Sequence, residues 1–166
     1  MIVYPVGTSG QTLLFHAKVI GWFERHQQLR WWQREAGGQL FARFEGDVIH
    51  VVEATGPRRT DRRGRSSYEP DRRAEQREID ERFPLGLHFI GDWHTHPEDH
   101  PIPSYLDLRS TAEGVRRSHH VLNAFVMAIV GRVSLPSGLL ISLHDGVTQH
   151  DLRPAPPAFG NPPDRG

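Results

Sequence analysis

Residues 87–107 read LHFIGDWHTHPEDHPIPSYLD, and this stretch decides which fold the chain adopts. Residues 87–94 are mostly apolar and predict a buried β-strand. Three prolines between positions 97 and 103 exclude a regular element there, and the next segment, 104–119, predicts a helix. The stretch therefore places a strand, an irregular connection and a helix start in succession, with two histidines where the strand ends.

Strands and helices also alternate on both sides of this stretch. Helices are predicted over 17–29, where Val19, Ile20, Phe23 and Leu29 share one face, and over 71–83. Period-two or short apolar runs predict further strands at 12–16, 39–45, 47–54, 124–130, 138–146 and 147–153. This order predicts an α/β fold with a mixed, mostly antiparallel sheet flanked by helices.

The length of 166 residues is typical of one domain, which we place at residues 1–152. Residues 55–73 are rich in Gly, Pro, Ser and Arg and predict a long, exposed, Arg-rich insertion. The insertion is either a solvated loop or a clamp that contacts a substrate. Residues 153–166 hold five of the thirteen prolines and are expected to form a disordered tail.

Composition excludes several functional classes. The twenty basic and twenty acidic side chains cancel, which disfavours a nucleic-acid binder that acts through overall positive charge. Cysteine is absent, so disulfides, thiol nucleophiles and cysteine zinc sites are excluded. No apolar run reaches the roughly 20 residues that span a bilayer, and the first residues lack a signal-peptide pattern. We therefore expect a cytoplasmic protein without membrane contact.

The histidines at the end of the central strand are candidates for binding a metal. His94 and His96 are two residues apart, so an extended backbone points both imidazoles to one side. Asp107 lies in the first turn of the following helix and could supply a third ligand, which leaves a fourth position open as catalytic zinc requires. The alternatives are a chance pair of polar histidines and a helix-capping role for Ser104 and Asp107.

Glu35 is a further candidate, at the entry to the strand that begins near Gly37 and Gly38. A single Glu near a turn is usually only solvated. A metal-dependent hydrolase, however, needs a carboxylate that is not a ligand, because a proton must move from water to the leaving group.

Taken together, these positions resemble a known motif. Glu35 followed at a distance by His94-x-His96, seven residues, Ser104, two residues and Asp107 matches the JAMM motif. The sequence thus resembles the JAB/MPN/Mov34 metalloprotease family, which implies a JAB1/MPN fold of cytidine-deaminase-like architecture. The stretch GDWHTHPEDHPIPS is similar to the bacterial branch, whose members are found beside ubiquitin-like conjugation enzymes, notably in CBASS anti-phage operons.

The resemblance implies one Zn²⁺ per chain, bound by His94, His96 and Asp107, with Glu35 as general base and acid. Ser104 would polarise the scissile carbonyl or hold the oxyanion. The implied activity is that of a zinc metallopeptidase, a deubiquitinase-like isopeptidase. It would act on a protein with an extended C-terminal tail, either a ubiquitin-like protein or a CBASS cyclic-oligonucleotide synthase.

The resemblance also implies partners, and it leaves two alternative functions open. Ubiquitin-like activating and conjugating enzymes from the same operon are the implied partners. Alternative functions are a JAMM peptidase that matures a sulfur-carrier or phage protein, and a non-catalytic MPN binding module.

Overall fold

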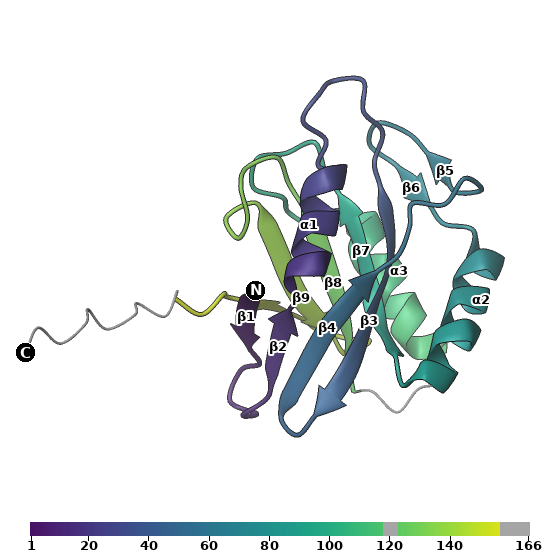
Figure 1. Cartoon of the computed structure of the whole chain (residues 1–166). Helices are drawn as coiled ribbons and strands as arrows, with labels where there is room; N and C mark the ends of the chain where they lie inside the picture. Colours follow the sequence, from purple (N-terminus) through teal and green to yellow (C-terminus); the bar gives the residue numbers. More distant parts are fainter. Residues whose placement is uncertain (118–122, 157–166) are drawn as a thin grey trace, which may run out of the picture.

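The computed structural model describes residues 1–117 and 123–156. The chain forms an eight-stranded mixed sheet in the order β1-β2-β4-β3-β7-β8-β9-β10 (Figure 1). Its strands are β1 (Ile2–Pro5), β2 (Thr12–Phe15), β3 (Gly37–Glu45), β4 (Val48–Ala54), β7 (His88–Thr95), β8 (Phe125–Val130), β9 (Leu139–His144) and β10 (Gln149–Leu152). Only the β2–β4 and β7–β8 pairs are parallel, so the predicted mixed, mostly antiparallel sheet is confirmed.

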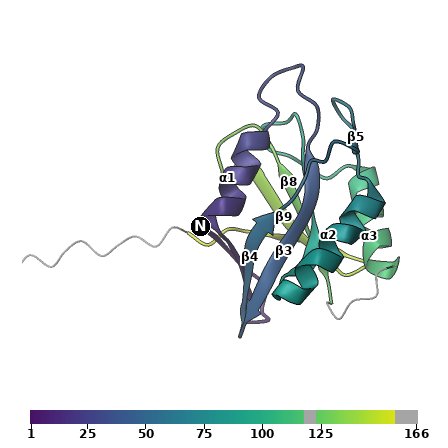
Figure 2. The ribbon, with the colours of Figure 1, turned by 45° about the vertical axis from the view of Figure 1, so that its right-hand side comes forward.

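Helices cover both faces of the sheet. Helix α1 (Ala17–His26) lies on one face, and α2 (Arg72–Arg82) and α3 (Tyr105–Arg117) lie on the other (Figures 1 and 2). A short 3-10 turn, η1 (Phe83–Leu85), follows α2. Among the described residues, no helix is long and apolar enough to cross a membrane.

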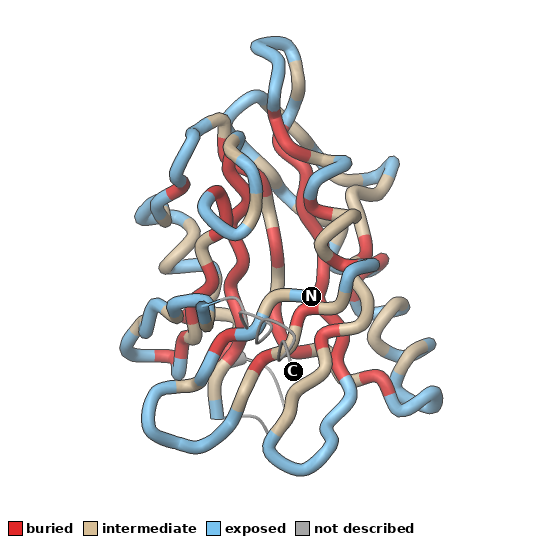
Figure 3. Tube along the Cα trace, turned by 60° about the vertical axis from the view of Figure 1, so that its left-hand side comes forward, coloured by how far each residue is buried: buried red, intermediate tan, exposed pale blue. Residues whose placement is uncertain are grey.

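The main core lies between α1 and the sheet. Val19 and Phe23 of α1 pack with Phe15 and Trp93, and all four side chains are fully buried. Buried residues follow the strands through the middle of the molecule, whereas the connections are mostly exposed (Figure 3). Because successive strand residues face opposite sides, Trp93 enters this core while its neighbours face α2 and α3.

Strand β7 occupies the centre of the sheet. It pairs antiparallel with β3, where His94 is opposite Gly37, and parallel with β8, where His94 is opposite Ile129. All six residues of β8 are buried, as expected for a central strand covered on both faces. The histidine segment is therefore held by neighbours on both sides.

Three local expectations differ from the structure. Strand β1 was not predicted, because four residues ending in proline carry little signal. The helix predicted over 17–29 was expected to include Leu29 in its apolar face. Helix α1 instead ends at His26, and Leu29 is exposed. The insertion is not uniformly exposed: it contains β5 (Arg62–Arg63) paired with β6 (Tyr68–Glu69), and the side chain of Arg58 is buried.

Two expectations extend past the described residues. The helix predicted over 104–119 is observed as α3, and its last two positions lie outside the described part of the chain. In the predicted tail, the backbone N–H of Ala155 donates to the carbonyl of Val3, and residues 157–166 lie outside the described part.

Candidate metal centre

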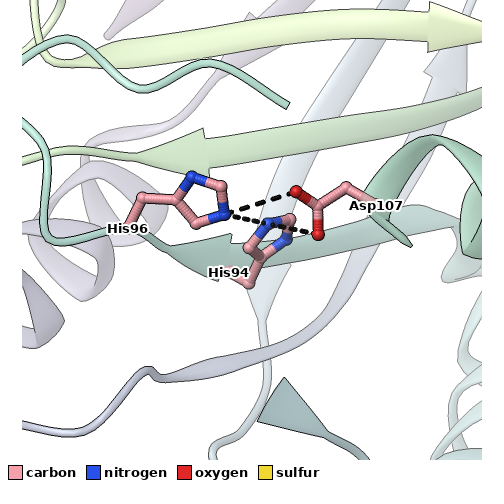
Figure 4. Close-up of side chains that lie close together, drawn as sticks. All are labelled: His94, His96 and Asp107. Carbon is pink, nitrogen blue, oxygen red and sulfur yellow. Dashed lines mark hydrogen bonds and ion pairs between the residues drawn. The ribbon is translucent and has the colours of Figure 1, made fainter. Parts of the chain in front are cut away.

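Two imidazoles converge at the end of β7. The backbone N–H of His96 donates to the carbonyl of Val130, which continues the β7–β8 ladder past Thr95. This extended backbone keeps His94 and His96 on one side of the sheet, and their Nε2 atoms lie 3.1 Å apart (Figure 4). The strand therefore presents two nitrogen donors to one point.

Asp107 reaches the same point from the first turn of α3. Its Oδ1 lies 3.2 Å from Nε2 of His94, and its Oδ2 lies 3.3 Å from Nε2 of His96. The same carboxylate accepts a hydrogen bond from the backbone N–H of Ser104 at 2.7 Å, and Ser104 Oγ accepts one from the N–H of Asp107. This capping box starts the helix and aims the carboxylate at the histidines, so the capping and ligand interpretations hold together.

The three donors fit a tetrahedral zinc site. Bonds of about 2.0–2.1 Å to imidazole and carboxylate separate tetrahedral ligands by about 3.3–3.4 Å. The two imidazole Nε2 atoms lie 3.1 Å apart, close to that value, and each lies near a different oxygen of Asp107: His94 is 3.2 Å from Oδ1 and His96 is 3.3 Å from Oδ2. Among the residues that the structure describes, this is the one group of three or more His and acidic side chains close enough to bind an ion. His100 is not part of it, because its Nδ1 contacts the carbonyl of Ser137.

The contact between Asp107 and His96 shifts the pKa of each residue. Burial acts to raise the pKa of Asp107, but hydrogen bonds from His94 and His96 outweigh it and hold that pKa well below its ordinary value. Burial acts to lower the pKa of His96, and its contact with Asp107 and the charges of Glu35 and Glu98 raise it. The carboxylate is thus ionised at neutral pH, the form that binds a cation.

Glu35 is held beside this centre by the insertion. Its side chain is 6% exposed, and its backbone N–H donates to the carbonyl of Gly64 at 2.8 Å. The guanidinium of Arg63 donates to the Glu35 carbonyl. Burial raises the pKa of Glu35 to about 7, with His96 opposing the rise. A carboxylate with a pKa near neutrality can both accept and return a proton.

The two glycines after Glu35 allow the insertion to approach closely. A Cβ at Gly37 would come within 2.6 Å of the Tyr68 ring, and one at Gly38 would collide with the Thr55 backbone. Gly37 and Gly38 lie opposite His94 and Trp93 in the β3–β7 pair. The Glu-x-Gly-Gly pattern therefore lets residues 55–69 lie against the start of β3, directly after Glu35.

A cleft of about 460 Å³ connects these residues. Residues of α2 and α3 line it, together with Asp92, His94 and His96 from β7 and its end, and with Glu35, Ser104 and Asp107. All five residues singled out in the sequence therefore line one cavity. The substrate of any chemistry at the three donors would enter through this cleft.

Sequence reasoning missed the polar residues that support the site. Gln28, which falls in the helix predicted over 17–29, is 2% exposed and links Thr95 to the carbonyl of Gln33 in the loop before Glu35. Arg58 is buried against Glu78, Glu75 and Asp61. Glutamine and arginine are usually exposed, so the sequence gives no sign that these two are buried. Gln28 is buried because α1 ends before it, and Arg58 because the insertion folds back.

Comparison with known proteins gives consistent matches. The model of the family described as prokaryotic homologues of the JAB domain matches residues 24–141. A CD-NTase/cGAS isopeptidase of Pseudomonas aeruginosa is 32% identical, covering 76% of this chain and 82% of that protein. A protein of the same name from Escherichia coli is 29% identical, covering 70% of this chain and 74% of that one. A probable metalloprotease of Sinorhizobium fredii is 34% identical over 48% of this chain and 52% of its own length.

Solved structures share the fold. A protein from Desulfitobacterium hafniense superposes with a TM-score of 0.59 at 17% identity, covering 84% of this chain and 88% of that one. A protein from Salinibacter ruber gives a TM-score of 0.50 at 20% identity, covering 82% and 86%. At these identities the likeness concerns the arrangement of strands and helices.

Proposed function

This chain belongs to the prokaryotic homologues of the JAB domain, and from that premise we propose that it is a zinc-dependent isopeptidase of JAMM type. The observation that carries the proposal is the convergence of His94, His96 and Asp107, whose ligand atoms lie within 4.8 Å of one another, with Glu35 in the same cleft. The names of the relatives, isopeptidase and metalloprotease, support the same reaction class.

His94, His96 and Asp107 would bind the zinc ion through two imidazole nitrogens and a carboxylate oxygen. When bound, the ion supplies Lewis acidity and can lower the pKa of a coordinated water to about 7. Glu35 accepts the proton of the attacking water and returns it to the leaving amine, as its position and its raised pKa allow. The hydroxyl of Ser104 lines the cleft and donates to the carbonyl oxygen on which negative charge develops.

The proposed substrate is a protein with an extended C-terminal tail joined to an amine. The relatives named CD-NTase/cGAS isopeptidase favour a cyclic-oligonucleotide synthase that is conjugated through its C-terminus. The alternative substrate is a ubiquitin-like protein with such a tail. Removing the conjugate would reverse or limit the anti-phage signalling of a CBASS system. This activity would take place in the bacterial cytoplasm. Activating and conjugating enzymes of that operon would supply the substrate.

The test combines metal content with one cleavage assay. We expect about one zinc per chain, and cleavage of a synthase carrying a C-terminal fusion that stops when a chelator is added. Glu35→Gln is the matched control, because it leaves the three proposed ligands intact and should retain zinc while losing turnover. Cleavage that survives both the chelator and Glu35→Gln would refute the proposed chemistry. A chain that binds no zinc and cleaves nothing would instead be a binding module.

A further inference from the structure

The loop before Glu35 exposes two adjacent tryptophans. Trp31 is 73% exposed and Trp32 58% exposed, and Leu29 beside them is 61% exposed. We call residues 29–32 the tryptophan loop. It rises beyond the sheet between α1 and β3 (Figure 1). Large apolar side chains grouped on a surface mark interaction sites, and tryptophan is prominent among residues that dominate binding energy.

Hydrogen bonds hold the tryptophan loop against the insertion. The guanidinium of Arg65 donates to the carbonyl of Trp31, and Nε2 of Gln28 donates to the carbonyl of Arg65 at 2.9 Å. Figures 1 and 2 both show the loop beside the hairpin that contains β5 and β6. We call residues 62–69 the insertion hairpin. The tryptophans are therefore presented from a fixed backbone, so a partner would not have to order this loop on binding.

The surface around the tryptophans is basic. Four exposed arginines lie in or directly beside the tryptophan loop and in the insertion hairpin: Arg30, Arg34, Arg62 and Arg65. The acids nearby do not balance these arginines, because the buried Asp61 lies 3.9 Å from a different arginine, Arg58, and Glu69 lies 3.8 Å from Arg62 alone. This local excess differs from the net charge of zero for the whole chain. Charge complementarity therefore favours an acidic partner.

The surface adjoins the proposed catalytic residue. Glu35 lies three positions after Trp32, and its backbone N–H donates to Gly64 in the insertion hairpin. A protein held on the tryptophan loop would thus lie next to the cleft that contains His94 and His96. Contacts that lie outside the cleft contribute to substrate recognition without taking part in the chemistry.

The ring geometry favours a peptide over a nucleic acid. Trp31 and Trp32 meet edge to face, with centroids 5.8 Å apart and planes at 89°, so they do not form two parallel platforms for successive bases. The guanidinium of Arg30 lies over the Trp32 ring, 5.4 Å from its centroid, and covers one of its faces. Apolar side chains can pack against such edges while carboxylates pair with the arginines.

We propose that the tryptophan loop and the insertion hairpin together form a docking surface for an acidic segment of the protein substrate that also carries apolar side chains. The inference rests on the proposed function, since it assigns a specificity to the same site. It extends that function by naming the chemistry of the substrate region that lies beyond the cleaved tail.

The test measures binding of a short fluorescent peptide of alternating Asp or Glu and Leu or Phe residues to the full-length chain. We expect Trp31→Ala/Trp32→Ala to weaken binding about tenfold or more. Arg62→Glu should weaken it about fivefold and reduce its salt dependence. Leu85→Ala and Arg43→Glu are the matched controls, because Leu85 and Arg43 are also exposed and lie outside this surface.

Several outcomes would overturn the proposal. These are equal binding of a peptide with Gln in place of every acid, unchanged binding by the double tryptophan variant, no measurable binding, or tighter binding of single-stranded oligothymidylate. Because the readout is binding, its failure leaves chelator-sensitive cleavage of a tail intact. Failure of the proposed isopeptidase activity would instead abolish cleavage and leave peptide binding unchanged.

Discussion

The hydroxyl of Thr95, which stands between the two candidate ligands His94 and His96, donates a hydrogen bond to Oε1 of Gln28 over 2.9 Å. Thr95 Oγ1 also accepts from the backbone N–H of Ala36 at 2.9 Å. Nε2 of Gln28 donates in turn to the carbonyl of Gln33 at 3.3 Å. The residue that faces away from the candidate metal therefore ties the ligand strand to both sides of Glu35.

Thr95→Val should destabilise the chain by about 2 kcal/mol, since it keeps the side-chain volume and leaves the Ala36 N–H and Gln28 Oε1 buried without their partner. Urea unfolding of the metal-free chain measures the change. Thr95→Ser restores the hydroxyl and should recover most of the stability. Unchanged stability in Thr95→Val together with a loss in Thr95→Ser would show that packing of the methyl group, and not the hydrogen bonds, is what Thr95 contributes.

The pH dependence of cleavage should follow Glu35. A general base works as the carboxylate, so kcat/KM should rise with pH as Glu35 loses its proton. Burial raises its pKa to about 7, and a bound cation favours the carboxylate, so the midpoint should lie between the ordinary value of 4.5 and about 7. Rate profiles measured at saturating zinc test this. Activity that falls across that range as pH rises would contradict the role of Glu35 as general base.

Asp107→Asn and Ser104→Ala should separate metal binding from helix capping. Asn retains an oxygen that can accept from the Ser104 N–H, but it lacks the charge, so zinc affinity should fall by more than about 100-fold with a small change in stability. Ser104→Ala removes the other half of the box and should cost about 1 kcal/mol while zinc binding persists. Zinc competition titrations and urea unfolding distinguish the two. If both variants lose zinc equally, the cap and the ligand cannot be separated.

Arg58→Met should destabilise the chain by about 3 kcal/mol, because it removes the cation that pairs with Glu78 and that also lies beside the buried carboxylates of Glu75 and Asp61. Arg58 is 9% exposed and contacts Glu78 at 2.6 Å and Glu75 at 3.6 Å. Arg59→Met is the control, since Arg59 is the exposed neighbour and its loss should change stability by less than about 0.5 kcal/mol. Similar unfolding midpoints for the two variants would mean that the buried network contributes nothing.

Asp92 should make the metal-free chain less stable as pH rises. Burial, with a smaller effect of Glu75, raises the pKa of Asp92 above its ordinary value, so the folded state holds a proton that the unfolded state releases. Its Oδ1 has no hydrogen-bond partner within the described ranges. Asp92→Asn should therefore stabilise the chain at pH 8 relative to pH 5. Urea unfolding at the two pH values measures the difference, and an equal effect at both would contradict the raised pKa.

Most of the sheet and the candidate site could be predicted because their patterns are local. Strand β7 and the start of α3 follow from one apolar run, three prolines and a capping box in a single stretch. The distance between His94 and Asp107 could not be calculated from spacing, but the motif resemblance placed them together.

The supporting residues could not be predicted because their partners are distant in sequence. Gln28 hydrogen-bonds Arg65 and Thr95, and Arg58 pairs with Glu78, all contacts that form only once the insertion folds back. Leu29 and the tryptophan loop were assigned to a helix or left without a role, since apolar composition alone does not distinguish an inward face from an exposed loop.

The three candidate ligands come from elements of unequal persistence. His94 lies in the central strand β7 and His96 directly follows it, whereas Asp107 belongs to α3, in which Ala112 and Val115 are the buried side chains among those described. In the native state, a surface helix with few buried side chains unfolds locally far more often than a central strand does. The rate at which a bound ion exchanges with solution would then be set by transient detachment of α3, long before the sheet unfolds. Metal retention and global stability would accordingly be separate properties of this chain.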